Sequence, residues 1–273
     1  MSQALLEQSG PRVLTTVEHT DSTIDQALPS WVTRWDVSLV QNDIYKLPDR
    51  DTPSRFAASP HSLPTHPKVS QRGHLTVQGI IVDKVRMSFQ IDVTEQTGVG
   101  FRESSTGRLG SLKIALEDLS RESSRCQYNN RVDAFCRTLC IGATRFQRRF
   151  PRHAQCLAEI LEGSHKPEPG KMVHKMEDET EAMVYYSEIK AICTNRSFII
   201  TDTGYFGLGP LISRPGDTAC VIIGVDVAFM LRGTAEEGSY RLLGESYMHG
   251  LMQGQVRGMV QRNEVVEQSI VIC

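Results

Sequence analysis

A C-terminal segment of short apolar runs and glycines holds a small set of side chains that could act in catalysis. The acidic and nucleophilic groups there are Asp202, Asp217, Asp226, Glu245, Ser246 and His249. Serine, histidine and a carboxylate are the parts of a nucleophilic triad. Ser246 and His249, however, stand three residues apart on an expected strand and so face opposite sides. The sequence GESYM around Ser246 also lacks the second glycine of a nucleophile elbow. We therefore predict no catalytic residues in this segment.

Three closely spaced glycines, Gly204, Gly207 and Gly209, suggest a phosphate-binding loop. Such a loop needs a following helix, whose amino end supplies free N–H groups. Pro210 follows instead, and the chain has no Gly-Lys-Ser/Thr sequence at this point. We therefore interpret these glycines as residues that permit tight turns and bulges in a sheet.

The cysteines and histidines do not form a recognisable metal motif. Seven cysteines are present without any C-x-x-C pair, which argues against a zinc ribbon or a thioredoxin-like site. Cys136 and Cys140 could share a metal on one helix face, but no second pair lies nearby, so buried thiols in a reducing compartment are the better interpretation. Three histidines fall in or beside a proline-rich segment and are interpreted as surface residues: His61, His66 and His74. We predict neither a metal nor a cofactor.

Composition narrows the class of partner. The formal net charge of the 273-residue chain is −2, so no overall positive field exists to hold nucleic acid or an anionic membrane. One basic run stands out and is interpreted as a solvated helix end: Arg145, Arg148, Arg149 and Arg152. The polar N-terminus lacks a signal-peptide core, and the longest apolar run, Ala219 to Leu231, is too short to span a membrane. We expect a soluble, cytoplasmic protein that binds neither nucleic acid nor membrane.

The elements that would position these residues change in type along the chain. Alternation of apolar and polar residues predicts a strand at 74–85. Apolar residues at helical spacing predict helices near 131–162 and at 182–194, with a further short helix at 109–119. Prolines between residues 41 and 72 indicate a long loop. Trp31 and Trp35, four residues apart, are expected on one side of a short helical turn.

From residue 198 onward, apolar runs of strand length alternate with glycine-rich turns. Arg214 to Asp217 has the composition of a type II turn, with proline second and glycine third. Two strands are expected to join across Gly224, and two more to be separated by Gly244. At least five such strands favour a small β-barrel or sandwich.

The predicted fold class is therefore α+β, with a helical middle segment packed with a C-terminal small β-barrel or sandwich. The predicted division is 1–27 for a helical connector, 28–195 for a mixed region, 196–258 for an all-β unit and 259–273 for a tail.

Several stretches of sequence resemble one family. They are FIITDTGYFGLGP, RPGD, CVIIGVDVAFMLR and YRLLGESYMHGLMQG, preceded in the same order by LPSWVTRWD, RFAAS, LTVQGIIVDKV and DAFCRTL. Together they resemble the C-terminal region of fungal heterokaryon incompatibility (HET) proteins, from Leu28 to Gly254. Members usually begin with a HET domain that carries a tryptophan–isoleucine–aspartate-type motif, which does not occur here. The chain thus resembles a truncated family member, and the resemblance assigns no active-site residue.

The resemblance implies a non-enzymatic recognition or regulatory module, because full-length relatives act in non-self recognition and programmed cell death. The expected partner is a protein, with a HET-domain chain as one candidate. Our candidate contact residues are the aromatic pair Tyr205 and Phe206, expected to be exposed, together with Glu245 and His249. The alternative is an enzyme or accessory protein of fungal specialised metabolism, which would need Glu245, His249 or Asp202 to face a pocket beside the β unit.

Overall fold

The structure is a computed structural model that describes residues 2–35, 44, 56–60, 66–91, 126–142, 152–162 and 180–273. Its helices are α1 (Ser2–Ser9), the 3-10 helix η1 (Gly10–Thr16), α3 (Arg131–Leu139), α5 (His153–Leu161), α6 (Glu181–Cys193) and α7 (Gln255–Gln261). Its strands are β1 (Lys68–Val69), β2 (Leu75–Gln90), β3 (Arg196–Thr201), β4 (Phe206–Pro210), β5 (Thr218–Ile222), β6 (Ala228–Gly233), β7 (Ser239–Met248) and β8 (Glu267–Ile272).

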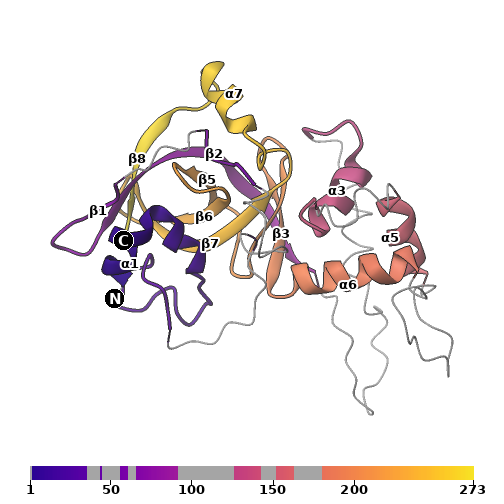
Figure 1. Cartoon of the computed structure of the whole chain (residues 1–273), viewed down its shortest axis with the longest axis horizontal. Coiled ribbons are helices and arrows are strands. Elements are labelled where there is room, and N and C mark those ends of the chain that lie inside the picture. Colours follow the sequence, from indigo (N-terminus) through magenta and orange to yellow (C-terminus); the bar gives the residue numbers. More distant parts are fainter. Residues whose placement is uncertain are drawn as a thin grey trace, which may run out of the picture.

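Within the described residues, the strands form one eight-stranded sheet in the order β1-β2-β3-β4-β7-β6-β5. Because β5 also pairs with β2, the sheet closes on itself as a barrel (Figure 1). β8 pairs antiparallel with the first part of β2, residues 75–80. It also pairs parallel with the start of β7, at Ser239 and Tyr240. The fold is thus α+β, and of the two predicted β architectures it is the barrel.

The long strand β2 makes closure possible. Residues 79–84 pair with β5, and residues 85–90 pair with β3. Register shifts between Ile81 and Asp83 and between Val85 and Met87 bend the strand from one partner to the next. Gly79 lets the neighbouring strands approach, because a Cβ there would lie 2.6 Å from Ile270 Cδ1. The strand predicted at 74–85 is therefore confirmed, and it continues to residue 90.

The expected hairpin and turn are present. β5 and β6 pair antiparallel around Gly224, with Cys220 opposite Phe229. In the turn before β5, Gly216 has a φ of +92°, and the Asp217 N–H donates to the Arg214 carbonyl at 3.1 Å. Both features are those of a type II turn.

Gly244 has a different role from the predicted one. It does not separate two strands but lies inside the continuous strand β7. Opposite it, the register jumps from Met230–Gly244 to Leu231–Leu242, so β7 contains a bulge. Gly244 has a φ of +150°, and a Cβ there would lie 3.1 Å from the Val17 carbonyl oxygen. The bulge therefore lets the N-terminal segment cross close to β7, where Glu18 bridges to Gly244.

The helices α3, α5 and α6 lie together beside the barrel (Figure 1). An Asn130 side chain caps α3 by accepting from the Asp133 N–H, and Thr180 caps α6 in the same way through Met183. Asn195, which follows the α6 cap residue Thr194, has a φ of +58°. Phe135 of α3 packs on Phe198 of β3 with ring centroids 5.0 Å apart. Helices predicted near 131–162 and 182–194 are thus confirmed, whereas the helix predicted at 109–119 lies outside the described residues.

The two tryptophans do not share one side of a helical turn as expected, because one is buried and the other exposed. Trp31 is buried, and its Nε1–H donates to the Gly73 carbonyl at 2.8 Å. Trp35 is 65% exposed, and the segment forms turns and bends, not a helical turn with both indoles on one side. Ser30, next to Trp31, donates its backbone N–H to the Cys273 carbonyl at 3.0 Å. The N-terminal segment thereby binds the end of β8.

The sheet extends beyond the segment 196–258 that was expected to contain it. Residues 267–272 are strand β8, which is hydrogen-bonded to β2, so the interpretation of 259–273 as a tail is corrected. The sequence pattern alone does not predict this pairing. Half of the β8 residues are exposed, and the partner strand β2 lies far away in sequence.

The close approach of β4 and β7 can be tested by replacing Gly207 with alanine. A Cβ at this position would lie 2.6 Å from both Met248 Sδ and the Tyr247 carbonyl oxygen, so Gly207→Ala forces the strands apart. We expect a loss of about 1–3 kcal/mol in the free energy of unfolding, measured by urea titration. Gly233→Ala, where a Cβ meets nothing within 4 Å, is the matched control. Equal stability of the two variants would contradict this account.

Candidate functional site

The predicted aromatic pair lies at the start of β4. Tyr205 is half-buried, and Phe206 is 2% exposed. The expectation that both rings are exposed is therefore wrong for Phe206. Its ring packs against Tyr128 and Phe198, with centroids 5.0 and 5.6 Å away, because β4 faces the helical layer here. Phe206 belongs to the core that joins barrel and helices.

Tyr128 ties β4 to the end of β7. Its hydroxyl donates to the His249 carbonyl at 2.8 Å and accepts the Phe206 N–H at 3.0 Å. The His249 N–H in turn donates to the Phe206 carbonyl at 2.8 Å. Burial raises the pKa of Tyr128 well above its usual value, so the hydroxyl stays protonated and able to donate. Phe206 and His249 are therefore neighbours in the structure, as part of one hydrogen-bonded junction.

The imidazole of His249 packs against two tyrosines, Tyr128 and Tyr247. Its Nδ1 lies 3.0 Å from the Tyr247 hydroxyl, and its ring lies against Tyr128. Burial lowers the pKa of His249, and the nearby Arg137 guanidinium lowers it further, while Asp133 acts in the opposite sense. A neutral imidazole at neutral pH follows.

Glu245 is held in a buried ion pair and is not exposed to solvent. Arg196 Nη2 is 3.1 Å from Glu245 Oε1, and the two side chains are 1% and 5% exposed. Arg196 Nη1 also donates to the Glu245 carbonyl at 3.3 Å, and the Ile44 N–H donates to Oε1. A buried carboxylate with these partners holds β7 against β3 and against the segment at Ile44.

The remaining acid and nucleophile candidates are dispersed. Ser246 is fully buried, and within the described residues its hydroxyl has no hydrogen-bond partner. Asp202 is exposed at the β3–β4 turn. Asp217 is bonded to Arg232, and Asp226 lies 3.7 Å from Arg12. No contact in the described part of the chain joins Ser246, His249 and a carboxylate.

The glycine-rich segment has the expected structural role. Gly204 turns with a φ of +95°, while Gly207 and Gly209 lie within β4. The next regular element after β4 is strand β5 and not a helix. A Cβ on Gly209 would lie 2.7 Å from Ser213 Oγ, so this glycine allows close packing.

The cysteines are free thiols, and most of them are buried. Burial raises the pKa of Cys136 to about 12, so this thiol remains protonated and unreactive. Over the described residues, no group of three or more His, Cys, Asp or Glu is arranged to hold a metal ion.

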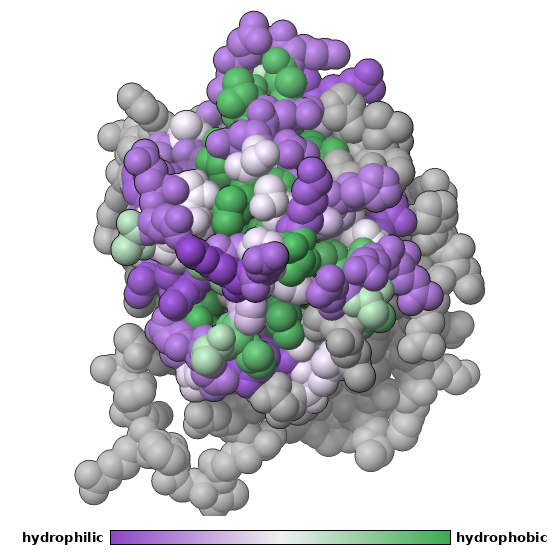
Figure 2. All heavy atoms as spheres, turned by 90° about the vertical axis from the view of Figure 1, so that its left-hand side faces the viewer, coloured by the Kyte–Doolittle hydropathy of each residue, from purple (hydrophilic) through white to green (hydrophobic). Residues whose placement is uncertain are grey.

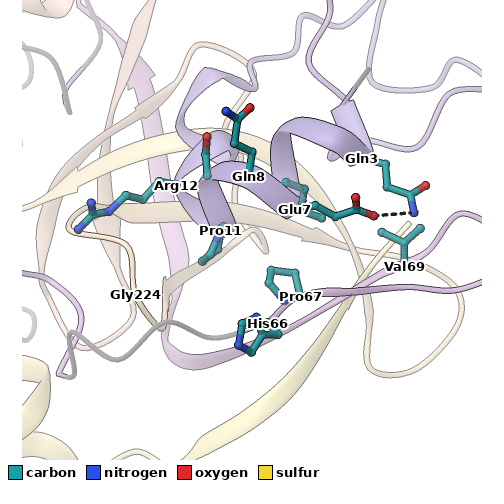
Figure 3. Close-up of a pocket in the computed structure, with 12 residues that line it drawn as sticks. Gln3, Glu7, Gln8, Pro11, Arg12, His66, Pro67, Val69 and Gly224 are labelled. Carbon is teal, nitrogen blue, oxygen red and sulfur yellow. Dashed lines mark hydrogen bonds between the residues drawn. The ribbon is translucent and has the colours of Figure 1, made fainter.

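A cavity of about 550 Å³ lies between the N-terminal helices and the barrel. In Figure 3, Glu7 points toward Gln3 at one end, Arg12 lies at the other, and Pro11 and Pro67 face each other between them. None of Tyr205, Glu245 and His249 lines this cavity. On the described part of the molecular face near α1 and β1, small apolar areas are separated by hydrophilic side chains (Figure 2).

The sequence did not reveal two residues that organise this region, Tyr128 and Arg196. Tyr128 stands in a polar stretch without any pattern. Arg196 follows a predicted helix and is the first residue of a strand, a position at which a charged residue is usually solvated. The burial of all six residues of this strand appears only in the structure, so the sequence carried no signal that Arg196 is buried.

The ion pair can be tested by Glu245→Gln. The change replaces the carboxylate 3.1 Å from the buried Arg196 guanidinium by a neutral amide, and we expect a loss of about 3–5 kcal/mol in unfolding free energy. The control is Asp25→Asn, which breaks an ion pair whose aspartate is 78% exposed and should cost less than about 1 kcal/mol. The double variant Arg196→Met with Glu245→Leu should recover part of the loss. Similar losses in control and test variants would show that burial of the pair is unimportant.

Stability should also depend on pH through two buried histidines and one half-buried histidine. Burial lowers the pKa of His19, His153 and His249 in the folded chain, whereas in the unfolded chain a histidine titrates near pH 6.5. The unfolded state therefore takes up protons first as pH falls, so this stability is fully present above about pH 6.5 and is lost below it.

We expect the melting temperature to fall between pH 7.5 and pH 5.5, and to fall less in His249→Gln than in the unmodified chain. His66→Gln, at an exposed histidine, is the control. Thermal unfolding followed by circular dichroism measures the difference, and an unchanged pH slope in His249→Gln would contradict it.

None of the helices in the described ranges has both the length and the apolar character that crossing a membrane requires.

Parts of this chain are similar in sequence to known proteins. Residues 117–266 match the family model described as the Het-6 beta-barrel domain, which is more than half of the chain. Over 82 residues, the chain is 32% identical to heterokaryon incompatibility protein 6, OR allele, of Neurospora crassa. The aligned part is 29% of this chain and 12% of that relative, so the chain spans only a small part of its length. No solved structure matches the chain.

Proposed function

Because this chain belongs to the Het-6 beta-barrel domain family, we propose that it is a non-enzymatic recognition module of the heterokaryon incompatibility type. It binds another protein in a non-self response that leads to programmed cell death. The similarity to heterokaryon incompatibility protein 6 of Neurospora crassa supports this assignment. The candidate partner is a chain that carries a HET domain.

The observation that carries the proposal is the use of the chemically capable groups as structural contacts. Glu245 neutralises Arg196, and His249 is engaged by Tyr128 and Tyr247. In an enzyme of the alternative kind, these groups would converge on a pocket with Asp202. The cavity of about 550 Å³ is lined by none of the three. The geometry therefore favours a scaffold that presents a surface.

The contact surface is the turn that contains Asp202, Thr203 and Tyr205. The Asp83 carboxylate accepts from both the N–H and the hydroxyl of Thr203, at 2.9 and 2.6 Å. Gln127 donates to the Thr203 carbonyl at 3.1 Å. These bonds fix the turn before any partner arrives, which lowers the entropic cost of binding.

Tyr205 supplies the aromatic group of this surface. Partial burial raises the pKa of its hydroxyl, and the carboxylates of Glu264 and Asp83 act in the same direction. The hydroxyl is thus a neutral hydrogen-bond donor beside acidic groups. Tyrosine with an apolar ring and a polar edge is enriched among residues that dominate protein interfaces.

The proposal is tested in Neurospora crassa by forming heterokaryons between strains that express this chain and strains that express heterokaryon incompatibility protein 6, OR allele. We expect uptake of a vital dye, which reports cell death, and capture of the tagged chain with a HET-domain protein. Tyr205→Ala should weaken that capture about tenfold, the loss of one interface anchor of about 1.4 kcal/mol.

Tyr205→Phe and Glu237→Ala are the controls, the second at an exposed turn residue away from this surface. Glu237→Ala should bind as the unmodified chain does, and Tyr205→Phe shows how much the hydroxyl contributes. Circular dichroism confirms folding of each variant. Absence of cell death and of any captured HET-domain protein, or equal capture by Tyr205→Ala, would contradict the proposal.

A further inference from the structure

A second cavity, of about 400 Å³, lies where the ends of β6 and β7 meet the N-terminal segment. Three guanidinium groups line it, from Arg214, Arg232 and Arg241, and two carboxylates, from Asp21 and Asp25. Neither the family match nor the candidate contact surface assigns a role to this cavity.

Two of the arginines stand directly opposite each other on neighbouring strands. Arg232 of β6 is the partner of Arg241 of β7 in the antiparallel register, so both side chains leave the same face of the sheet. Like charges in this arrangement repel each other and destabilise the sheet unless an anion lies between or beside them. Each arginine here has an aspartate partner, and the two partners differ in burial.

Asp217 fixes Arg232 rigidly. Its Oδ1 accepts from Arg232 Nε at 2.8 Å and its Oδ2 from Nη2 at 2.9 Å, while Nη2 also donates to the Ile212 carbonyl at 2.7 Å. Asp217 is 2% exposed and the Arg232 side chain 13%. An arginine has five N–H donors, and these bonds use three of them. The two N–H groups of Nη1 have no partner in the described part of the chain and remain for a ligand in the cavity.

The same carboxylate positions Arg214. Asp217 Oδ2 accepts the Arg214 backbone N–H at 2.8 Å, which anchors the type II turn beside Arg232. The Arg214 guanidinium is exposed and, among the described residues, has no hydrogen-bond or ion-pair partner. One buried aspartate therefore brings a fixed guanidinium and a free one to the same cavity.

Arg241 is neutralised from the opposite wall by Asp25. The pair is exposed, with 37% of the arginine and 78% of the aspartate side chain accessible to solvent. Exposed ion pairs contribute little stability, so an anion of higher charge can compete with Asp25 for Arg241. Asp21 adds a second carboxylate to this wall, and its negative charge lowers the affinity of the cavity for an anion.

From these contacts we propose that the cavity binds a phosphate group, carried by a small molecule or free in solution. Arg214, Arg232 and Arg241 approach it from a turn and from two strands, which suits an anion with oxygens in several directions. A planar carboxylate can engage the edge of one guanidinium, whereas a tetrahedral phosphate can accept from all three. Binding displaces the Asp25 carboxylate from Arg241.

The proposal is tested on the full chain by isothermal titration calorimetry at constant ionic strength, with inorganic phosphate, O-phosphoserine and acetate as probes. We expect both phosphate-bearing probes to bind and acetate to bind at least about tenfold more weakly, since it offers fewer charge-assisted hydrogen bonds. O-phosphoserine shows whether the cavity accepts a phosphate attached to an organic body.

Two variants act in opposite directions. Arg214→Gln removes a free guanidinium and should weaken phosphate binding about tenfold, while Asp25→Asn removes the competing carboxylate and should tighten it several-fold. Arg257→Gln, at an exposed arginine of α7, is the matched control and should leave binding unchanged. Both tested positions are exposed, so melting temperatures without phosphate should change little.

Three results would overturn the proposal. They are the absence of any phosphate binding, equal binding by Arg214→Gln and the unmodified chain, and acetate binding as tight as that of phosphate. The contact surface at Tyr205 involves none of these arginines, so the outcome is independent of the proposed recognition role.

Discussion

The ion pair between Arg196 and Glu245 is the interaction on which the barrel wall depends. Two opposite charges removed from water are stable only when each has the other, and losing one partner leaves an uncompensated buried charge. The pair fixes the first residue of β3 against the residue that follows the bulge in β7. The Ile44 N–H joins the same carboxylate, so a segment distant in sequence meets the barrel at this place. A single buried charge pair thereby joins β3, β7 and the segment at Ile44.

Close backbone approach is the second constraint, and it explains why the most chemically suggestive segment is architectural. Gly79 and Gly207 stand where a side chain would collide with a neighbouring strand, and Gly244 stands where the N-terminal segment crosses. A closed sheet with these contacts has little freedom to open, because interiors pack at high density and strain is costly. Groups such as Ser246 and Glu245 are enclosed by this packing, which leaves the turns and loop ends as the places where the chain can meet other molecules.

Both surfaces that we assign to binding follow one physical design. At the proposed contact surface the Asp83 carboxylate holds Thr203, and at the arginine cavity the Asp217 carboxylate holds Arg232. In each case an acidic group is used to fix geometry, and the neighbouring residue, Tyr205 or Arg214, is left for a partner.

The sequence by itself determined the local elements. Alternation predicted the strand at 74–85, proline and glycine placed the turn before β5, and helical spacing predicted α3, α5 and α6, because these features depend on residues close together in the chain. Short stretches of sequence, such as FIITDTGYFGLGP and RPGD, also indicated the heterokaryon incompatibility family. Only the tertiary structure decided that β2 closes the barrel, that β8 joins it, that Gly244 is a bulge and that Phe206 is buried. It alone brought Tyr128 to His249, Arg196 to Glu245 and Arg232 beside Arg241. The physical reason is that strand pairing and charge pairing are set by which distant segments share a face, and burial follows from that meeting and not from the order of neighbouring residues.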